Sequence, residues 1–596
     1  MAAPFAESRR LTGPSLYLDE PGAALQSAAD VVFDGDTLAR WRDNIAHARA
    51  ALDWPRGAVC VRPHAGGVSL ALAAPFDQLY TATAVNEWAW CDALGVAVVS
   101  DLAPLNGVAD RTEALRLLRQ AAQAEARPAL HALAAAAEQR AVPLLADDEA
   151  ASLGHGIHGR TWAIDALPAP ADVAWSALRA IPTALVTGSN GKTTTVRLLA
   201  AMTRAHGWAT AYSCTDGVYF DGQVLEAGDF SGPGGARAAL RHPQAQAAVL
   251  ETARGGLLRR GLAVRRADAA VVTNVSDDHF GEYGIHDLDG LAQVKLIVAK
   301  AIDAAGLLVL NADDPLLAQI SATLDCLVGW FAQDFAHPLL QRNRARGLPA
   351  CGVGDGRLLL APAGTQAAGE AIADLGNIAQ MPLTLHGRAG YNIANAAAAA
   401  LAAQALGVPH AAIAQVLATF GSASGDNPGR LQSWRFGDAR VVVDYAHNPA
   451  GLQGLFDAVD TAQRPARLGI LLGHAGNREH SDYVAVANTV AQQRPERVVL
   501  KDLSGLERGR AQGEVPQILR QALLQAGVPP AAIATQLDEP AAARELLQWA
   551  EAGDLLLLPI HTEAARTRVQ ALLQRMHQQA WRPGQPVPPL PELDHA

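Results

Sequence analysis

The stretch that decides the fold is residues 184–207, ALVTGSNGKTTTVRLLAAMTRAHG. It reads as an aliphatic strand, a turn that contains Gly188 and Gly191, and a helix that begins near Lys192. The two glycines let the backbone approach a phosphate closely, and the amide groups at the start of the helix can then surround its oxygens. Lys192 would hold the terminal phosphates, and the hydroxyl of Thr193 would bind Mg²⁺. This order predicts a nucleotide-binding P-loop rather than an ordinary glycine turn.

Strands and helices alternate on both sides of this loop. Aliphatic runs that end in polar residues recur at 247–253 (AAVLETA), 269–275 (AAVVTNV) and 306–314 (GLLVLNADD). Such alternation predicts a mainly parallel sheet with crossover helices, whose ligands bind at the carboxyl ends of the strands. After the linker GSASGDNPG at 421–429, a second series of aliphatic runs begins with ARVVVDYAH at 439–447.

The chain has 596 residues, too many for one ordinary domain. We predict an α/β protein of three domains. Residues 1–172 would form an α/β or α+β domain that serves substrate binding or oligomerisation. Residues 173–425 would form the central P-loop domain around a mainly parallel sheet, and residues 426–596 a Rossmann-like α/β domain.

Composition limits the classes of function. The chain has 48 basic and 59 acidic residues, a net charge of −11, which gives no footprint for nucleic acid or an anionic membrane. It has no apolar run near the roughly 18 residues that span a bilayer and no secretion signal at its start. The five cysteines are scattered without a CxxC pair. We therefore expect a cytoplasmic protein without membrane or nucleic-acid partners.

Further polar residues follow the predicted strands. Glu251 stands where a carboxylate could hold Mg²⁺ opposite Thr193, although it could instead pair with Arg254 or Arg259. His279, in TNVSDDHFGEYG, taken alone would more often be a structural histidine than a ligand. The segment NADDP at 311–315 taken alone is only a turn from strand to helix with an N-capping aspartate.

Joined in one chain, these strings resemble the Mur ligase superfamily. TGSNGKTT resembles its ATP loop, which also tolerates a residue other than glycine at the position of Val186, and DYAHNPAGL at 444–452 resembles a turn that closes over the nucleotide. The resemblance covers roughly residues 180–560. It implies an ATP-dependent ligase that forms an amide through an acyl phosphate, with ATP and two Mg²⁺ ions as cofactors, and with closure of the third domain about the linker SGDNPG.

The resemblance also assigns roles to particular residues. Lys295 would be a carbamate that binds the second metal, with an unmodified lysine on the helix surface as the alternative and Lys300 as a structural decoy. Asn392 and Asn395 would lie near the base, or else serve helix capping and packing. The nucleotide would be bound by Gly188, Ser189, Asn190, Gly191, Lys192, Thr193, Thr194, Asn274, Asn311, Asp314, Asn392, Asn395 and Arg430. The metal ligands would be Thr193, Glu251, His279 and Lys295, and the catalytic residues Lys192, His279, Lys295, Asp444 and His447.

Several strings look closest to the Mur-like half of cyanophycin synthetase, among them CTDGVYFDG, GDFSGPGGAR and ERGRAQGE. That half adds arginine to an aspartyl β-carboxylate. The cyanophycin enzymes also carry an ATP-grasp domain, for which residues 1–172 leave no room. GHAGNREHSDY keeps Gly476 and Arg478 of a family loop but has His480 and Ser481 in place of acidic residues, which puts the amine in doubt.

The implied substrates are a small-molecule or peptide carboxylate and an amino acid. The expected substrate residues are Asp216, Arg254, Arg478, Asp502 and Glu514. Asp502, Glu507 and Glu514 could equally form a structural network with Arg508 and Arg510. A homo-oligomer and a functional link to a cyanophycin synthetase are compatible with the resemblance. The alternatives are a non-catalytic ATP-binding paralogue or partner of cyanophycin synthetase, a Mur-type ligase with a UDP-peptide or folate acceptor, and a P-loop kinase or GTPase.

Overall fold

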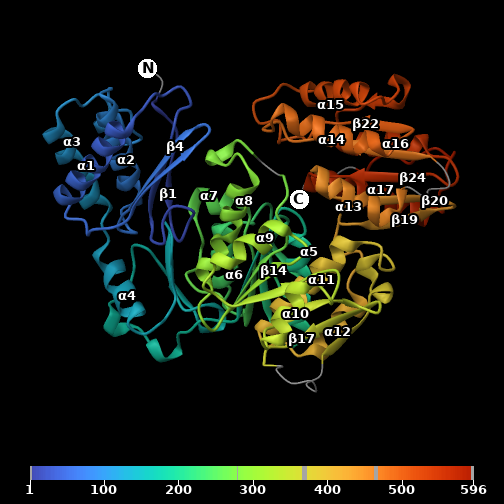
Figure 1. Ribbon diagram of the computed structural model, residues 1–596, viewed down its shortest axis with the longest axis horizontal. Helices are drawn as coiled ribbons and strands as arrows, with labels where there is room; N and C mark the ends of the chain where they lie inside the picture. Colours follow the sequence, from blue (N-terminus) through green and yellow to red (C-terminus); the bar gives the residue numbers. More distant parts are fainter. Residues whose placement is uncertain (1–2, 278–279, 365–371, 462–466, 592–596) are drawn as a thin grey trace.

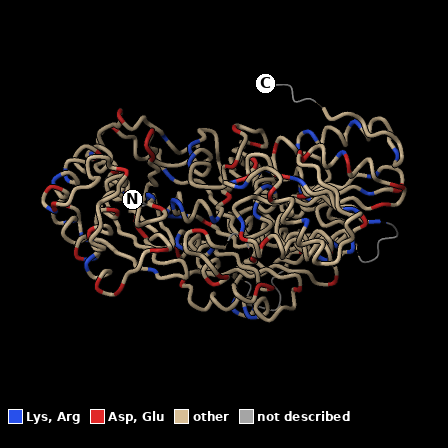
Figure 2. The backbone as a smooth tube through the Cα atoms, turned by 90° about the horizontal axis from the view of Figure 1, so that it is seen from above, with Lys and Arg blue, Asp and Glu red and all other residues tan. Residues whose placement is uncertain are grey.

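The computed structural model describes residues 3–277, 280–364, 372–461 and 467–591. Its larger sheets follow one another along the longest axis of the molecule in chain order (Figure 1). Acidic and basic residues are interspersed along the backbone (Figure 2). None of the helices in these ranges is long and apolar enough to cross a membrane.

The central sheet has eleven strands in the order β11-β10-β9-β12-β8-β13-β14-β15-β16-β17-β18. β8 (Thr183–Thr187) lies in its middle, between β12 (Ala247–Glu251) and β13 (Ala269–Val272), and pairs with both in parallel. Every residue of these three strands is buried, because helices cover both faces of the sheet. The other parallel strands are β9 (Thr210–Cys214), β14 (Leu307–Asn311), β15 (Val328–Phe331) and β16 (Ala350–Gly354), and antiparallel strands β10 (Gly217–Phe220), β11 (Gln223–Ala227), β17 (Arg357–Ala361) and β18 (Ala373–Asn377) form the edges.

Two hydrophobic cores lie on the two faces of this sheet. One contains α5 (Lys192–Ala205), α11 (Gly390–Ala405) and α12 (His410–Thr419). The alanines at 396–400 of α11 are all buried, because small side chains let this helix pack closely against its neighbours. The other core contains α6 (Pro233–Arg241), α7 (Arg254–Arg260), α8 (Leu288–Lys295), α9 (Pro315–Ile320) and α10 (Pro338–Ala345).

The C-terminal sheet has six strands in the order β19-β20-β24-β21-β22-β23. All but the edge strand β19 (Gln432–Phe436) run parallel: β20 (Ala439–Asp444), β24 (Leu555–Pro559), β21 (Leu468–Leu472), β22 (Arg497–Leu500) and β23 (Ile533–Thr535). One face is covered by α13 (Pro449–Val459), α14 (His480–Gln492) and α15 (Glu514–Gln525), the other by α16 (Glu539–Trp549) and α17 (Glu563–Gln578). The carboxyl ends of the parallel strands meet along one edge of this sheet, and the candidate site lies at that edge.

The N-terminal part is an antiparallel sheet, β1-β2-β4-β3, with helices packed against it, which decides between the two predicted alternatives in favour of α+β. Its elements are β1 (Phe5–Leu11), β2 (Gly22–Ser27), α1 (Gly35–Ala51), β3 (Val59–His64), β4 (Gly67–Ala73), α2 (Leu79–Leu94), α3 (Arg111–Glu125) and α4 (Pro128–Glu138), followed by a small sheet of β5 (Leu144–Ala146), β6 (Ala150–Leu153) and β7 (Arg160–Ala163). Buried Arg9 of β1 joins it to the central domain by donating from Nε to the Leu258 carbonyl, 2.9 Å away. The predicted fold class is confirmed, whereas the boundaries at residues 172 and 425 remain predictions.

Candidate active site

The loop between β8 and α5 has the backbone that its glycines predict. Gly188 and Gly191 have φ angles of 143° and 86°. A Cβ atom on Gly188 would lie 1.8 Å from Oγ1 of Thr273, and one on Gly191 would lie 2.2 Å from Oδ1 of Asn395. Both positions therefore require glycine for conformation and for space. Gly191 offers no side chain to cap α5, so the first amide groups of that helix face the pocket without a capping oxygen.

Lys192 lies folded across this loop. Its Nζ atom donates hydrogen bonds to the carbonyl oxygens of Gly188 and Ser189, each at 3.0 Å. The side chain lines the pocket, so its charge already stands where the loop would receive an anion.

Asn274, which follows β13, binds the backbone of the phosphate loop. Its Oδ1 accepts from the Asn190 amide and its Nδ2 donates to the Asn190 carbonyl, both at 3.0 Å. Ser189 adds a second tie, because its hydroxyl donates to the Ser276 carbonyl and accepts from the Ser276 amide. Asn274, which was predicted to bind the nucleotide, and Ser276 therefore hold the shape of the phosphate loop.

Glu251 ends β12 and is 1% exposed. Its Oε2 accepts a hydrogen bond of 2.8 Å from the Thr193 hydroxyl, and its Oε1 accepts one of 2.7 Å from the Thr215 hydroxyl. Arg254 pairs instead with Glu282, and Arg259 donates to a backbone carbonyl. The hydroxyl of Thr193 and the carboxylate of Glu251 are hard oxygen donors of the kind that Mg²⁺ prefers, so this pair fits the predicted metal.

The C-terminal domain supplies the opposite wall. Asp444 ends β20, and its carboxylate accepts from the amides of Leu431 (2.7 Å) and Ala446 (2.8 Å). Burial raises the pKa of Asp444 above its ordinary value, although Arg430 and the amides act against that rise. The carboxylate is thus bound to the turn 444–447, which it shapes.

Arg430 and Asn448 bring this wall to the phosphate loop. The Arg430 guanidinium lies 4.0 Å from the Tyr445 ring centroid and its Nη2 is 3.5 Å from the Thr193 hydroxyl. Asn448 caps α13 and donates from Nδ2 to Oδ1 of Asn190 at 3.1 Å. The two domains therefore meet around the loop.

One pocket gathers most of the predicted residues from both domains. Its lining includes Ser189, Asn190, Gly191, Lys192, Thr193, Thr194, Glu251, Asn274, Asn392, Asn395, Arg430, Asp444 and His447. Tyr391 and Thr215 also line it and were not predicted. Tyr391 precedes Asn392 in the sequence, but an aromatic residue at a helix start indicates packing as readily as binding.

Three other predicted residues lie outside the pocket lining that the structure describes. Asn311 donates to the Thr273 carbonyl, and Asp314 accepts from the Val275 amide and caps α9, so both brace strand ends outside the residues described as lining the pocket. Lys295 is 2% exposed at the end of α8, so the alternative of a surface lysine is wrong. Lys300 pairs with Asp19 of the N-terminal part. His279 lies outside the described residues.

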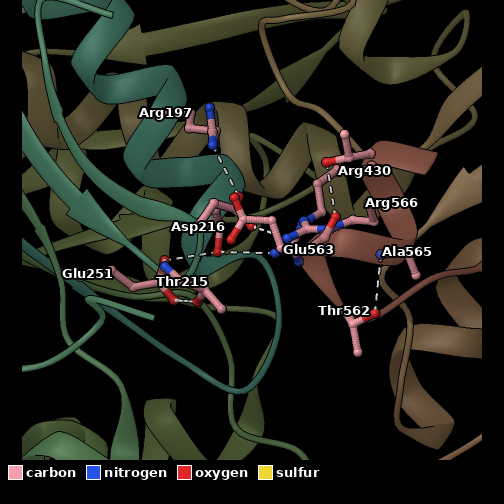
Figure 3. Close-up of polar contacts among 12 residues, drawn as sticks. Arg197, Thr215, Asp216, Glu251, Arg430, Thr562, Glu563, Ala565 and Arg566 are labelled. Atoms are coloured by element: carbon pink, nitrogen blue, oxygen red, sulfur yellow. Dashed lines mark hydrogen bonds and ion pairs between the residues drawn. The ribbon is translucent and has the colours of Figure 1, made fainter. Parts of the chain in front are cut away.

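Asp216 lies between two arginines (Figure 3). It is 5% exposed and accepts from Arg197 of α5 at 3.1 Å and from Arg566 of α17 at 2.6 Å. Burial alone would raise the pKa of Asp216, but Arg430, Arg566 and Arg197 outweigh it and hold the pKa at about 2. No motif pointed to Arg566, because TEAARTRVQ reads as an ordinary amphipathic helix.

The remaining predicted substrate residues make contacts away from the nucleotide pocket. Arg254 pairs with Glu282, which also accepts from Asn477 of the C-terminal domain at 2.6 Å. Arg478 is buried in the same loop as Asn477. Asp502 accepts from the Gly513 amide, and Glu514 pairs with Arg510 at 2.6 Å. The pair of Glu514 with Arg510 matches the structural-network alternative, whereas the contact of Asp502 is with the backbone.

Comparison with known proteins assigns both domains. The family described as Mur ligase middle domain matches residues 186–332, and the family described as Mur ligase, glutamate ligase domain matches residues 429–559. Cyanophycin synthetase of Synechocystis sp. (strain ATCC 27184 / PCC 6803 / Kazusa) is 37% identical over 379 residues, which are 63% of this chain and 42% of that protein. The UDP-N-acetylmuramoyl-L-alanyl-D-glutamate--2,6-diaminopimelate ligase of Gloeobacter violaceus is 28% identical over 64% of this chain and 72% of its own.

Among solved structures, E. coli FolC in complex with ADP shares 17% identity over 66% of this chain and 90% of its own, with a TM-score of 0.47. MurF from Acinetobacter baumannii shares 17% identity over 66% and 77% of the two chains, with a TM-score of 0.45. This chain spans less than half the length of the cyanophycin synthetases that it matches. The chain carries the middle domain and the glutamate ligase domain of the Mur ligases, joined in that order.

Proposed function

We propose that the protein is an ATP- and Mg²⁺-dependent ligase that activates a carboxylate as an acyl phosphate and joins it to an amine. The observation that supports this proposal is the pocket between the two domains. In it the phosphate loop, with Lys192, faces the turn that contains Asp444 and His447.

The residues of the pocket suit phosphoryl transfer to a carboxylate. Lys192 and Arg430 both line the pocket, and their charges would stabilise the negative charge that develops on the terminal phosphate. Thr193 and Glu251 would hold the metal, which when bound neutralises phosphate charge. Closure of the turn 444–447 over the loop would keep water away from the reactive anhydride.

The substrates that we propose are an aspartyl or peptide carboxylate and an amino acid of the arginine type. The identity of 37% with a cyanophycin synthetase supports this choice over a UDP-linked peptide or a folate acceptor, because the Gloeobacter ligase is only 28% identical. The polar contacts retained by Lys192, Thr193 and Glu251 favour an active ligase over a non-catalytic paralogue.

The test is product analysis of the full chain with ATP, Mg²⁺, aspartyl peptides and each amino acid in turn. We expect ADP release that requires both the acid and the amine, and a product mass that corresponds to an amide. Lys192→Ala should abolish this release. Lys300→Ala, which removes a lysine that pairs with Asp19, should leave it unchanged. A phosphorylated product without an amide, or full turnover by Lys192→Ala, would refute the proposal.

A further inference from the structure

Three ionisable side chains are buried together in the C-terminal domain behind the pocket. Lys501 follows β22, Glu539 begins α16, and His561 follows β24. Their exposed fractions are 0%, 3% and 7%. Burying charged groups costs free energy unless they are paired and hydrogen-bonded, so a cluster of this kind needs a structural or functional reason.

The three groups contact one another directly. The ammonium of Lys501 bonds to Oε1 of Glu539 and lies 3.2 Å from Nδ1 of His561. Glu539 also accepts from the backbone amide of His561 at 2.9 Å. The same carboxylate accepts from the hydroxyl of Thr562, the residue that caps α17.

The partners of His561 fix its protonation. Nε2 lies 3.2 Å from the Ala446 carbonyl, which can only accept, so Nε2 must carry the proton. Nδ1 lies 3.2 Å from the Lys501 ammonium, which can only donate, and 3.4 Å from Oε1 of Glu539, which can only accept. The shorter contact favours a ring whose proton is on Nε2 alone. Burial and the charge of Lys501 lower the pKa of His561 below its ordinary value, against the opposing effect of Glu539.

The carbonyl that His561 holds belongs to the turn of the pocket. The amide of Ala446 is bound by Asp444 at 2.8 Å and its carbonyl by His561, so the peptide units on both sides of Ala446 are fixed. The ring of His561 also packs against Tyr445 and His447, with centroid distances of 5.4 and 6.4 Å. The next residue, Asn448, reaches Asn190 of the phosphate loop.

We propose that His561 is a positioning residue, which, supported by Lys501 and Glu539, holds the Ala446 carbonyl and so keeps the His447 turn closed over the phosphate loop. Its effect on turnover rests on the proposed function; its effect on the turn does not. Neither Asp444 nor Glu539 can replace it at this carbonyl, because a carboxylate cannot donate.

The experiment compares His561→Gln with His561→Leu in the full chain. The glutamine amide can reach the place of Nε2 and donate to Ala446, whereas leucine fills a similar volume without a donor. Hydrogen–deuterium exchange of residues 444–451 should rise about tenfold in His561→Leu, the size expected for loss of one hydrogen bond to a buried carbonyl, and return close to wild type in His561→Gln. His410→Leu, in α12 of the central domain, is the matched control and should not change exchange there.

Turnover gives a second readout. We expect His561→Leu to lower kcat about tenfold with ADP affinity changed less than threefold, and His561→Gln to restore most of kcat. Wild-type exchange in His561→Leu, or no rescue by His561→Gln, overturns the proposal. If His561→Leu does not fold, ¹⁵N spectra of the wild-type histidine rings decide, since a His561 ring without a proton on Nε2 also overturns it. If the wild type forms no ADP with any acid and amine, the proposed function fails while the exchange and ring spectra still test the positioning role.

Discussion

Arg566 of the C-terminal domain donates a hydrogen bond of 2.6 Å to Asp216 of the central domain, and the two residues are only 8% and 5% exposed. Asp216 adjoins Thr215, whose hydroxyl binds Glu251, the proposed metal ligand. The ion pair therefore joins the interface between the domains to the acid that ends β12 (Figure 3). We therefore expect that domain closure and the shape of the proposed metal site depend on one another through this pair.

Replacing Asp216 by alanine should strongly destabilise the protein. The change leaves Arg197 and Arg566 buried without their carboxylate, a loss of about 3–5 kcal/mol for a broken buried pair. Thermal unfolding should show a melting temperature several degrees lower. As a control, Arg116→Ala breaks the exposed pair of Arg116 with Glu113 on α3 and should change stability by less than about 1 kcal/mol. Equal melting temperatures for the two variants would contradict the assigned role.

The contribution of Asp216 should depend on pH. Its pKa is lowered from 3.8 to about 2 in the folded protein, so the folded state binds its proton less readily than the unfolded state. The stabilisation is therefore fully present above about pH 4.5 and is lost as the pH falls towards 2. The difference in melting temperature between wild type and Asp216→Asn should be constant from pH 7 to about pH 4.5 and then narrow. A difference in melting temperature that widens on acidification would show that the predicted direction of the pH dependence is wrong.

Glu251→Gln should uncouple nucleotide binding from Mg²⁺. Removing the charge takes away the ligand opposite Thr193 but keeps the shape of the side chain. Calorimetry of ADP binding should show that Mg²⁺ tightens binding to the wild type and has almost no effect on the variant, with turnover at least about 100-fold lower. Glu226→Gln, on exposed β11, serves as the control. An unchanged Mg²⁺ effect in Glu251→Gln would place the metal elsewhere.

Two glycines separate steric from conformational effects. Gly191 and Gly207 have similar φ angles of 86° and 99°, but a Cβ atom meets Asn395 only at Gly191 and open space at Gly207. Gly207→Ala should cost about 1 kcal/mol of strain and leave nucleotide affinity intact. Gly191→Ala should in addition reduce affinity for ADP at least about tenfold, measured by the same calorimetry, because the loop must shift. Similar affinities in the two variants would remove the steric argument.

Local sequence patterns predicted the phosphate loop and its helix because strand, glycine turn and helix start are all encoded within residues 184–207. They could not choose between α/β and α+β for the N-terminal part, since short apolar runs do not state whether their partners are parallel. Glu251 and Asn274, two motif residues that follow predicted strands, do line the pocket.

Contacts between domains could not be predicted in this way. Arg566 lies 350 residues from its partner Asp216, in a helix whose sequence suggests only amphipathic packing. Asp314 shows the opposite case, because the same acidic type at a strand end can cap a helix instead of facing a ligand. Only the tertiary arrangement distinguishes these outcomes.

The resting position of Lys192 has a consequence for selectivity. Its ammonium already donates to two carbonyl oxygens of its own loop, each 3.0 Å away, which leaves one N–H for a ligand. A ligand can take more than that one N–H only if it is a stronger acceptor than these carbonyls. Ionised phosphate oxygens meet this condition, while sugar hydroxyls and neutral amides do not. Lys192 therefore favours anionic phosphate groups over neutral ligands, whatever the shape of the rest of the molecule.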